Sequence, residues 1–221
     1  MTSLPFSSQL INLGAALLLL TSFAMLSQRR ILSLVNLFAV QGATLSISTA
    51  IVAYTSGQFH LYYSAALSVA LKVVLLPWIL HRLMRRLNVR WDTEPLLNIP
   101  TTMLVGIMLV VFAFTLAQPI ALLSTTIARS TLGIALAVVM LSFLMMITRT
   151  KAISQVVGFL AMENGLFFAA TSATYGMPMV VELGVALAVL VGMVILGVFF
   201  FQIREQFDSP DLQPTEAPKE D

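Results

Sequence analysis

Glu163 is the residue whose type and position most clearly suggest chemistry in this sequence. Together with Asn164 it lies in the middle of an apolar run that extends from Val157 to Phe168. An acidic side chain at the centre of a membrane helix costs roughly 2.5–3.5 kcal/mol on insertion scales, so it normally faces a partner group, a watery cavity or an ion path. The position therefore predicts a functional carboxylate, with Asn164 as a neighbouring hydrogen-bonding group.

A second charged residue, Lys72, lies in the middle of another apolar run. Ser68 precedes it by four residues and so shares its helix face, whereas Pro77 interrupts the backbone hydrogen-bond ladder about one turn later. One interpretation of Lys72 is a long side chain that snorkels to the lipid interface. Its depth in the run favours a buried lysine with a function instead.

Gln41, Glu182 and His60 are further polar candidates. A weak internal repeat relates Gln41 to Glu163 and His60 to Glu182. When the sequence is shifted by 121 positions, similar residues of segment 30–54 align with residues of segment 151–175, although apolar segments can also match by chance. The shift predicts two parallel copies of a three-helix unit. It places Gln41 one position from Glu163, and His60 one position from Glu182.

Glu182 and His60 each have a structural alternative. A carboxylate early in a helix complements the helix dipole, and a lone histidine at a helix entry is often an interfacial residue. Both are kept as candidates. The residues predicted to take part in ion translocation are Glu163, Lys72, Glu182, Gln41, Asn164 and His60.

These residue types favour the movement of protons or other ions over bond-making chemistry. Carboxyl and amine groups can exchange protons with water and with each other, and amides can bridge them by hydrogen bonding. The chain has no cysteine and only two histidines, and it lacks a phosphate-binding loop. We therefore expect no catalytic centre, metal or cofactor in this chain, and no binding to nucleic acid.

The elements that must position these groups are membrane helices. Hydrophobic residues make up 58% of the chain and charged residues 10%, against about 25% charged in soluble domains. A run of about 20 apolar residues can cross a bilayer, so we expect an all-α, polytopic membrane protein. The seven predicted spans are Leu10–Leu26, Ile31–Tyr54, Leu61–Leu80, Thr101–Leu122, Ser130–Ile147, Ala152–Thr174 and Pro178–Phe201.

The spans suggest four regions. Residues 1–98 form a first three-helix unit with a basic amphipathic loop, and residues 99–127 form a connecting transmembrane helix. A second three-helix unit covers residues 128–206. The acidic, proline-containing segment 207–221 is predicted to be a disordered tail.

Basic residues gather on one side of the predicted topology. Ten of them follow the first, third, fifth or seventh span, whereas Arg129 alone lies on the opposite side. The positive-inside rule then predicts a multi-pass protein of the cytoplasmic membrane with its N-terminus outside and its C-terminus in the cytoplasm. Segment 82–95, which carries four arginines and Trp91, is predicted to contact membrane lipids, with docking of a cytoplasmic subunit as the alternative.

The segments Gly158–Gly165 and Lys72–Pro77, together with Gln41 and the seven spans, resemble the component E (HyfE) subunits of hydrogenase-4-type formate hydrogenlyase and related energy-converting complexes. The last three spans are also similar to the K subunit of respiratory complex I (NuoK) and the C subunit of multisubunit cation/proton antiporters (MrpC). In that wider family a glutamate in the middle helix, matched here by Glu163, belongs to a charged axis through the membrane arm. The K subunit carries a second glutamate deeper in its last helix than Glu182, so the resemblance does not extend to Glu182.

The resemblance implies a non-catalytic membrane-arm subunit that packs beside antiporter-like membrane subunits and couples a cytoplasmic redox arm to proton or sodium translocation. It also implies that nickel–iron and iron–sulfur centres belong to partner subunits. Two other functions stay open from the residues alone. One is a stand-alone secondary transporter in which Glu163 and Lys72 bind the substrate or coupling ion, and the other is a structural spacer whose polar residues only pair internally.

Overall fold

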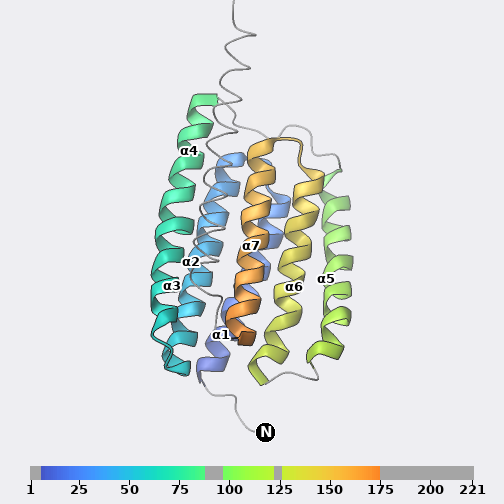
Figure 1. Cartoon of the computed structure of the whole chain (residues 1–221). Helices are drawn as coiled ribbons and strands as arrows, with labels where there is room; N and C mark the ends of the chain where they lie inside the picture. Colours follow the sequence, from blue (N-terminus) through green and yellow to red (C-terminus); the bar gives the residue numbers. More distant parts are fainter. Residues whose placement is uncertain (1–5, 88–96, 122–125, 175–221) are drawn as a thin grey trace, which may run out of the picture.

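The chain folds into a bundle of long helices, shown in Figure 1. The structure is a computed structural model that describes residues 6–87, 97–121 and 126–174. Its helices are α1 (Phe6–Ser27), α2 (Ile31–Ser56), α3 (His60–Ser68), the π-helical segment η1 (Val69–Leu75), α4 (Leu76–Leu87), α5 (Ile99–Ala121), α6 (Thr126–Thr148) and α7 (Ala152–Thr174).

Six helical stretches in the described residues are long and apolar enough to cross a membrane, with α3, η1 and α4 forming one continuous span from His60 to Arg85. The prediction of an all-α, multi-pass membrane protein is confirmed. The observed ends of these six helical stretches lie within a few residues of the predicted ones, except that the third continues to Leu87 rather than Leu80. The predicted seventh span and the tail 207–221 lie outside the described residues.

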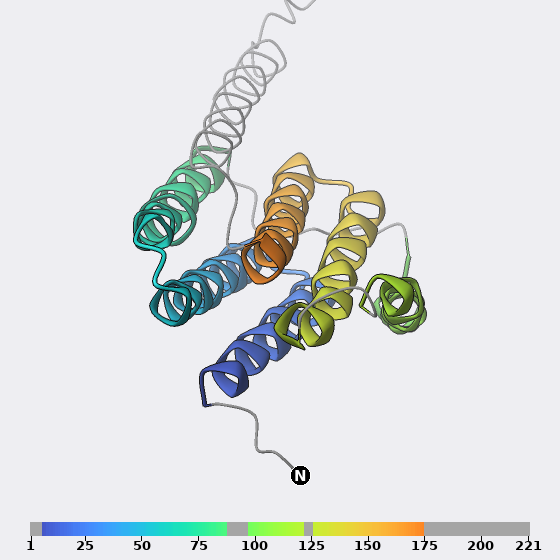
Figure 2. The same cartoon turned by 60° about the horizontal axis from the view of Figure 1, so that its bottom comes forward.

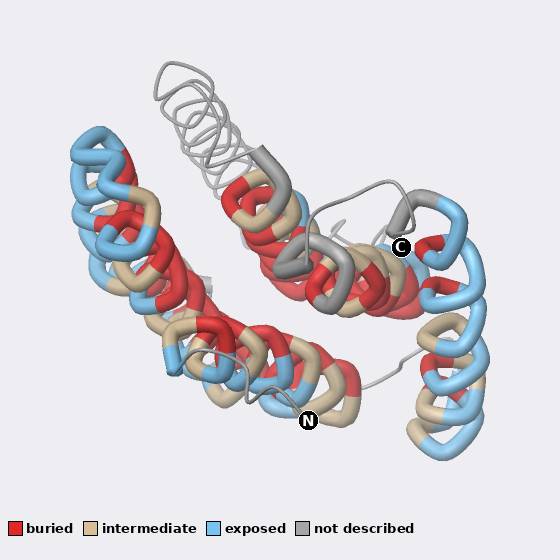
Figure 3. The backbone as a smooth tube through the Cα atoms, turned by 90° about the horizontal axis from the view of Figure 1, so that it is seen from below, coloured by how far each residue is buried: buried red, intermediate tan, exposed pale blue. Residues whose placement is uncertain are grey.

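Two helical hairpins form the centre of the bundle. In the α1–α2 and α6–α7 hairpins, α1 packs on α6 and α2 packs on α7, and both α1 and α6 point toward the same end (Figures 1 and 2). The α3–η1–α4 helix packs on α2 at one edge, and α5 packs mainly on α6 at the opposite edge. The residues on the sides of the helices that face neighbouring helices are buried, whereas most residues of α5 are not (Figure 3).

The two ends of the bundle differ in charge. Arg29 and Arg30 between α1 and α2, and Arg149 and Lys151 between α6 and α7, lie at one end, as does the arginine-bearing end of α4 (Figure 1). We call this the basic end. The N-terminal ends of α1 and of α3, which begins at His60, lie at the other end, and we call that the His60 end. The predicted assignment of these ends to the two sides of the membrane stays a prediction.

Pro77 explains why the third span is not a regular α-helix throughout. Proline has no backbone N–H and its ring crowds the preceding turn, so the ladder before it must rearrange. The backbone before Pro77 forms the wider π-helical turn of η1, in which the N–H of Leu76 donates to the carbonyl of Leu71, five residues earlier. Lys72 lies inside this segment, in the middle of the span.

Candidate ion-translocation site

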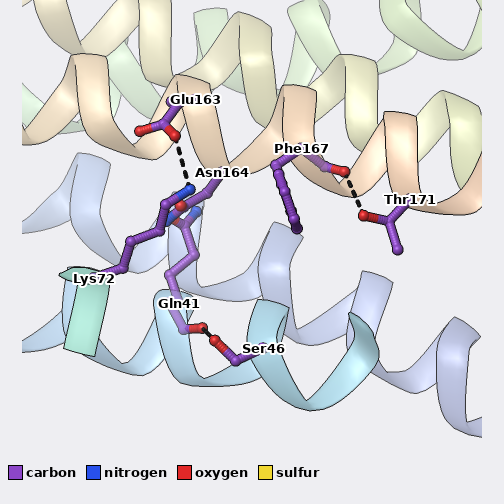
Figure 4. A network of polar contacts seen from close by, with 8 residues as sticks. Gln41, Ser46, Lys72, Glu163, Asn164, Phe167 and Thr171 are labelled. Atoms are coloured by element: carbon purple, nitrogen blue, oxygen red, sulfur yellow. Dashed lines mark hydrogen bonds and ion pairs between the residues drawn. The ribbon is translucent and has the colours of Figure 1, made fainter. Parts of the chain in front are cut away.

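Lys72 and Glu163 form an ion pair between two helices. The Nζ atom of Lys72 lies 2.9 Å from Oε1 of Glu163, with side-chain exposures of 2% and 13%. Figure 4 shows Lys72 reaching from η1 toward Glu163 on α7. Within the part of the chain that the structure describes, Glu163 is the only acidic residue, so the geometry joins the lysine to the one carboxylate within those ranges.

The pair lies at the centre of the bundle. Lys72 is 12 residues from His60 and 13 from Arg85, which are the ends of its span. Glu163 is close to the midpoint of α7. The side chain of Lys72 is buried rather than snorkelling to an interface. An unpaired charge at this depth in a membrane helix is costly, and the structure gives each of these two charged side chains a partner of opposite sign.

Two residues on neighbouring helices fix the position of Lys72. Its Nζ lies 5.1 Å from the centre of the Phe167 ring, one turn after Glu163 on α7. On the other side, Gly42 of α2 packs so closely that a Cβ atom there would lie 3.1 Å from Cβ of Lys72. The absence of a side chain at Gly42 is therefore what lets α2 approach η1 at the level of the pair.

A chain of amide and hydroxyl groups runs beside the ion pair from α7 to α1. Asn164 donates from Nδ2 to Oε1 of Gln41 over 3.1 Å, and Gln41 donates from Nε2 to Oγ of Ser22 over 2.9 Å. Ser22 in turn donates to the carbonyl of Leu18. All donors in this chain point the same way, from the helix that carries Glu163 toward α1.

Two atoms at this centre have hydrogen-bonding capacity left over. Among the described residues, Oδ1 of Asn164 has no hydrogen-bond donor, and Nζ of Lys72 has no hydrogen-bond acceptor apart from its ion-pair partner Glu163. Both residues are buried. Since buried polar atoms in proteins are nearly always satisfied by protein or water, these two atoms are positions where water or another polar group can bind.

The structure thus brings together four of the six predicted residues: Glu163, Lys72, Gln41 and Asn164. His60 is exposed at the first turn of α3, about 18 Å along the helix from Lys72 at 1.5 Å per residue, and is not part of this cluster. Glu182 lies outside the described residues. The roles of all six in ion movement stay predictions.

Sequence analysis missed Phe167 and Ser22. Phe167 follows Glu163 by four residues, so a search for aromatic residues on the helix face of the carboxylate would have found it. Nothing in the sequence separates Ser22 from the other serines of α1, because its role depends on the packing of α1 against α2. Among the described residues, no group of three or more His, Cys, Asp or Glu side chains could hold a metal ion.

The arrangement provides one titratable pair and one polar chain in an apolar bundle. A proton delivered to Glu163 neutralises the carboxylate and leaves the ammonium of Lys72 without its counter-ion, which forces one of the two side chains to find another partner or to give up a proton. Loss of a proton from Lys72 has the converse effect on Glu163. A pair of this kind can couple the arrival of one charge to the displacement of another, and its role in this chain stays a prediction.

Similar proteins provide independent information on the family. The chain is 31% identical over 206 residues to "Uncharacterized protein Rv0085" of Mycobacterium tuberculosis, which covers 93% of this chain and 94% of that protein. It is 24% identical over 190 residues to "Hydrogenase-4 component E" of Escherichia coli and of Shigella flexneri, covering 86% of this chain and 88% of theirs. Neither a protein-family model nor a solved structure matches the chain. The chain therefore belongs to the same protein family as Rv0085 and is distantly similar to hydrogenase-4 component E.

Proposed function

We propose that this chain is a non-catalytic membrane subunit of a hydrogenase-type energy-converting complex and that its Lys72–Glu163 pair takes part in redox-coupled translocation of protons or sodium ions. Support for the complex comes from the similarity to hydrogenase-4 component E, which extends over most of both chains. Support for a role in ion movement comes from the buried charge pair itself. Nickel–iron and iron–sulfur centres, where the complex has them, belong in this proposal to other subunits.

The observation that carries the proposal is the 2.9 Å contact between Lys72 and Glu163 at mid-depth in the bundle. Apolar side chains would stabilise a purely structural contact between η1 and α7 at least as well. The free energy of desolvating two opposite charges equals or exceeds the free energy of their attraction. Ionisable residues inside a membrane are by default candidates for ion or proton pathways. A lysine and a glutamate at this position are best explained by a role in which the pair gains or loses a proton or contacts a moving ion.

The test is the substitution Glu163→Gln in the intact complex. Glutamine keeps the size and hydrogen-bonding capacity of the side chain but cannot carry the charge. We expect the complex to assemble, electron transfer to continue, and ion uptake into reconstituted vesicles to fall strongly. Lys151→Gln, which removes an exposed charge at the basic end, is the matched control and should leave uptake unchanged.

Unchanged ion uptake with Glu163→Gln would refute the proposed role of the pair. A defect of equal size in Lys151→Gln would also refute it, because the effect would then follow from net charge and not from the pair. Measuring uptake of H⁺ and of Na⁺ separately in the same vesicles identifies the coupling ion.

The proposed partners are antiporter-like membrane subunits and a cytoplasmic redox arm. A subunit needs surfaces for such neighbours, and α5 exposes large apolar side chains along much of its length, among them Leu104, Met108, Val111 and Phe112. Purification through a tag on this chain in mild detergent should recover large membrane subunits with it. A chain that is recovered alone, while its variants still change ion flux, would favour the stand-alone transporter.

A further inference from the structure

The buried face of the third span changes character at Lys72. On the His60 side of Lys72, this face carries the hydroxyl residues Ser64 and Ser68 together with Leu61 and Ala65. On the basic side, the buried side chains are aliphatic or thioether: Leu76, Leu80 and Met84. The buried face of this helix thus carries polar groups toward the His60 end of the bundle and only apolar groups toward the basic end.

Helix α2, which packs on this span, shows the same change at the same level. Beyond Gln41 and Gly42, toward the His60 end, it buries Ser46, Ser48 and Thr49 among its apolar residues. Toward the basic end the buried residues of α2 are all apolar: Ile31, Leu34, Val35 and Phe38. On both helices, therefore, the buried residues on the His60 side include hydroxyl groups, and those on the basic side are apolar.

The contact between Gly42 and Lys72 sets the register of these two antiparallel helices. One turn toward the His60 end brings Ser46 to the level of Ser68, and the next turn brings Thr49 close to the level of Ser64. We call these four residues the hydroxyl seam, and all four are buried. Ser46 and Thr49 donate to carbonyls of their own helix, which leaves their oxygen atoms able to accept hydrogen bonds.

One turn from the same contact toward the basic end, Phe38 comes to the level of Leu76. A second turn brings Leu34 to the level of Leu80. These four side chains belong to a single buried apolar cluster that also includes Val157 and Leu160 of α7. The other buried hydroxyl groups in this half of the bundle lie on α1, α5, α6 and α7 and not between α2 and α4; they are Thr21, Ser22, Thr102, Ser142, Thr148 and Ser154. The interface between α2 and α4, on the basic side of the ion pair, is therefore filled by apolar side chains.

We propose that water and protons reach the Lys72–Glu163 pair through the hydroxyl seam from the His60 end, while the apolar cluster insulates the pair from the basic end. This inference deepens the proposed function, on which it rests for its physiological meaning. The seam supplies acceptors and donors at successive turns, and the incompletely bonded Nζ of Lys72 and Oδ1 of Asn164 supply buried polar atoms where such a path ends. A water column needs two to four polar partners for each water, which the seam can provide and the apolar cluster cannot.

Single cysteines test the proposal directly, because the native chain contains none. Ser64→Cys and Ser68→Cys report on the seam, and Leu76→Cys and Leu80→Cys report on the apolar cluster at comparable depth. His60→Cys and Lys151→Cys mark the two exposed ends. The complete complex, in sealed vesicles of either orientation, is exposed to Ag⁺ for increasing times, and unreacted thiol on the purified chain is then counted with a maleimide after denaturation.

We expect Ser64→Cys and Ser68→Cys to react roughly tenfold or more faster than Leu76→Cys and Leu80→Cys, because a thiol reacts as a hydrated thiolate and a dry, buried cysteine is inert. The faster reaction should occur when Ag⁺ is on the side from which His60→Cys is labelled. Equal rates at the four positions, no reaction at the seam, or reaction of the seam only from the Lys151 side would each overturn the proposal.

The labelling result is independent of ion pumping. If Glu163→Gln leaves pumping intact while the seam alone is labelled, the proposed function fails and the access path stands. If Glu163→Gln abolishes pumping while the seam is unreactive, the function stands and the access path fails. Retained electron transfer in each cysteine variant shows that the complex is folded and assembled during the measurement.

Discussion

The ammonium group of Lys72 lies 5.1 Å from the centre of the Phe167 ring, while Oε1 of Glu163, one turn earlier on α7, lies 2.9 Å from the same nitrogen. One helix thus offers Lys72 both an anion and an aromatic face. The ring does not titrate, so it attracts the lysine whether or not Glu163 carries a charge. Phe167 is therefore suited to hold the ammonium in place in the proposed mechanism, in which the carboxylate takes up a proton.

Replacing Phe167 by leucine should destabilise the chain by more than the loss of packing explains. A desolvated cation–π contact is worth about 2 kcal/mol. Phe168→Leu is a matched control, because Phe168 is adjacent and also buried but makes no cation–π contact within the described residues. Thermal unfolding of the purified chain in detergent measures both, and the excess cost at Phe167 should disappear when Lys72 is also replaced by methionine. Equal costs at the two positions in the native background would contradict the assignment.

The ion pair should show strong coupling in a double-mutant cycle. Removing one partner leaves a buried charge, which costs about 3–5 kcal/mol in other proteins, whereas removing both by apolar or neutral groups of similar size is often close to neutral. Lys72→Met and Glu163→Gln should each lower stability, and Lys72→Met/Glu163→Gln should recover much of the loss. The double variant should still fail to translocate ions. Additive losses in unfolding experiments would show that the two groups do not interact in the folded chain.

The fold and half of the site follow from sequence for a simple physical reason. Spans such as Ala152–Thr174 are bounded by charged or polar residues, and the cost of burying charge in lipid makes Glu163 and Lys72 conspicuous. What the sequence does not contain is the rotation of each helix about its axis. Without it, Gly42 looks like part of a general packing face, Phe167 looks like one apolar residue among many, and Ser22 has no reason to lie near Gln41.

The π-helical segment illustrates the same limit. Pro77 predicts a disturbed ladder, but not whether the chain will kink, open or widen its turn. The close approach of α2 at Gly42 favours widening, since η1 then presents Lys72 against a helix with no side chain in the way. The position of Lys72 is thus a property of two helices together and cannot be obtained from either alone.

Gly42 should tolerate no larger residue without a loss of the site. In Gly42→Ala the new Cβ lies 3.1 Å from Cβ of Lys72 and 3.4 Å from its carbonyl oxygen, so η1 must shift by a few tenths of an ångström. Overpacking of this kind costs about 1–3 kcal/mol, and Gly42→Val should cost more than Gly42→Ala. Ala70→Val adds volume on the exposed face of η1 and serves as the control. A graded fall in unfolding temperature at position 42, with none at position 70, supports the close contact, and equal behaviour at the two positions argues against it.

Arg149 should be essential for joining the two hairpins at the basic end. Its guanidinium is buried, and Nη2 lies 2.9 Å from the carbonyl of Leu26 and 3.3 Å from that of Met25, at the last turn of α1. Carbonyls at a helix C-terminus lack donors within the helix and attract positive charge. Arg149 supplies such a donor to the carbonyl of Leu26, and it shares the carbonyl of Met25 with the backbone N–H of Gln28.

Lysine keeps the charge of Arg149 but has neither the planar fork nor the same reach. Arg149→Lys should therefore lower the free energy of unfolding by about 1–3 kcal/mol, the cost of leaving buried polar groups unpaired. Lys151→Ala, two residues away and exposed, should change it little. Because Arg149 lies far along the helices from the ion pair, its loss should weaken the packing of α1 on α6 without changing the coupling between Lys72 and Glu163 in the double-mutant cycle. A reduced coupling in the Arg149→Lys background would instead show that the basic end and the ion pair act as one unit.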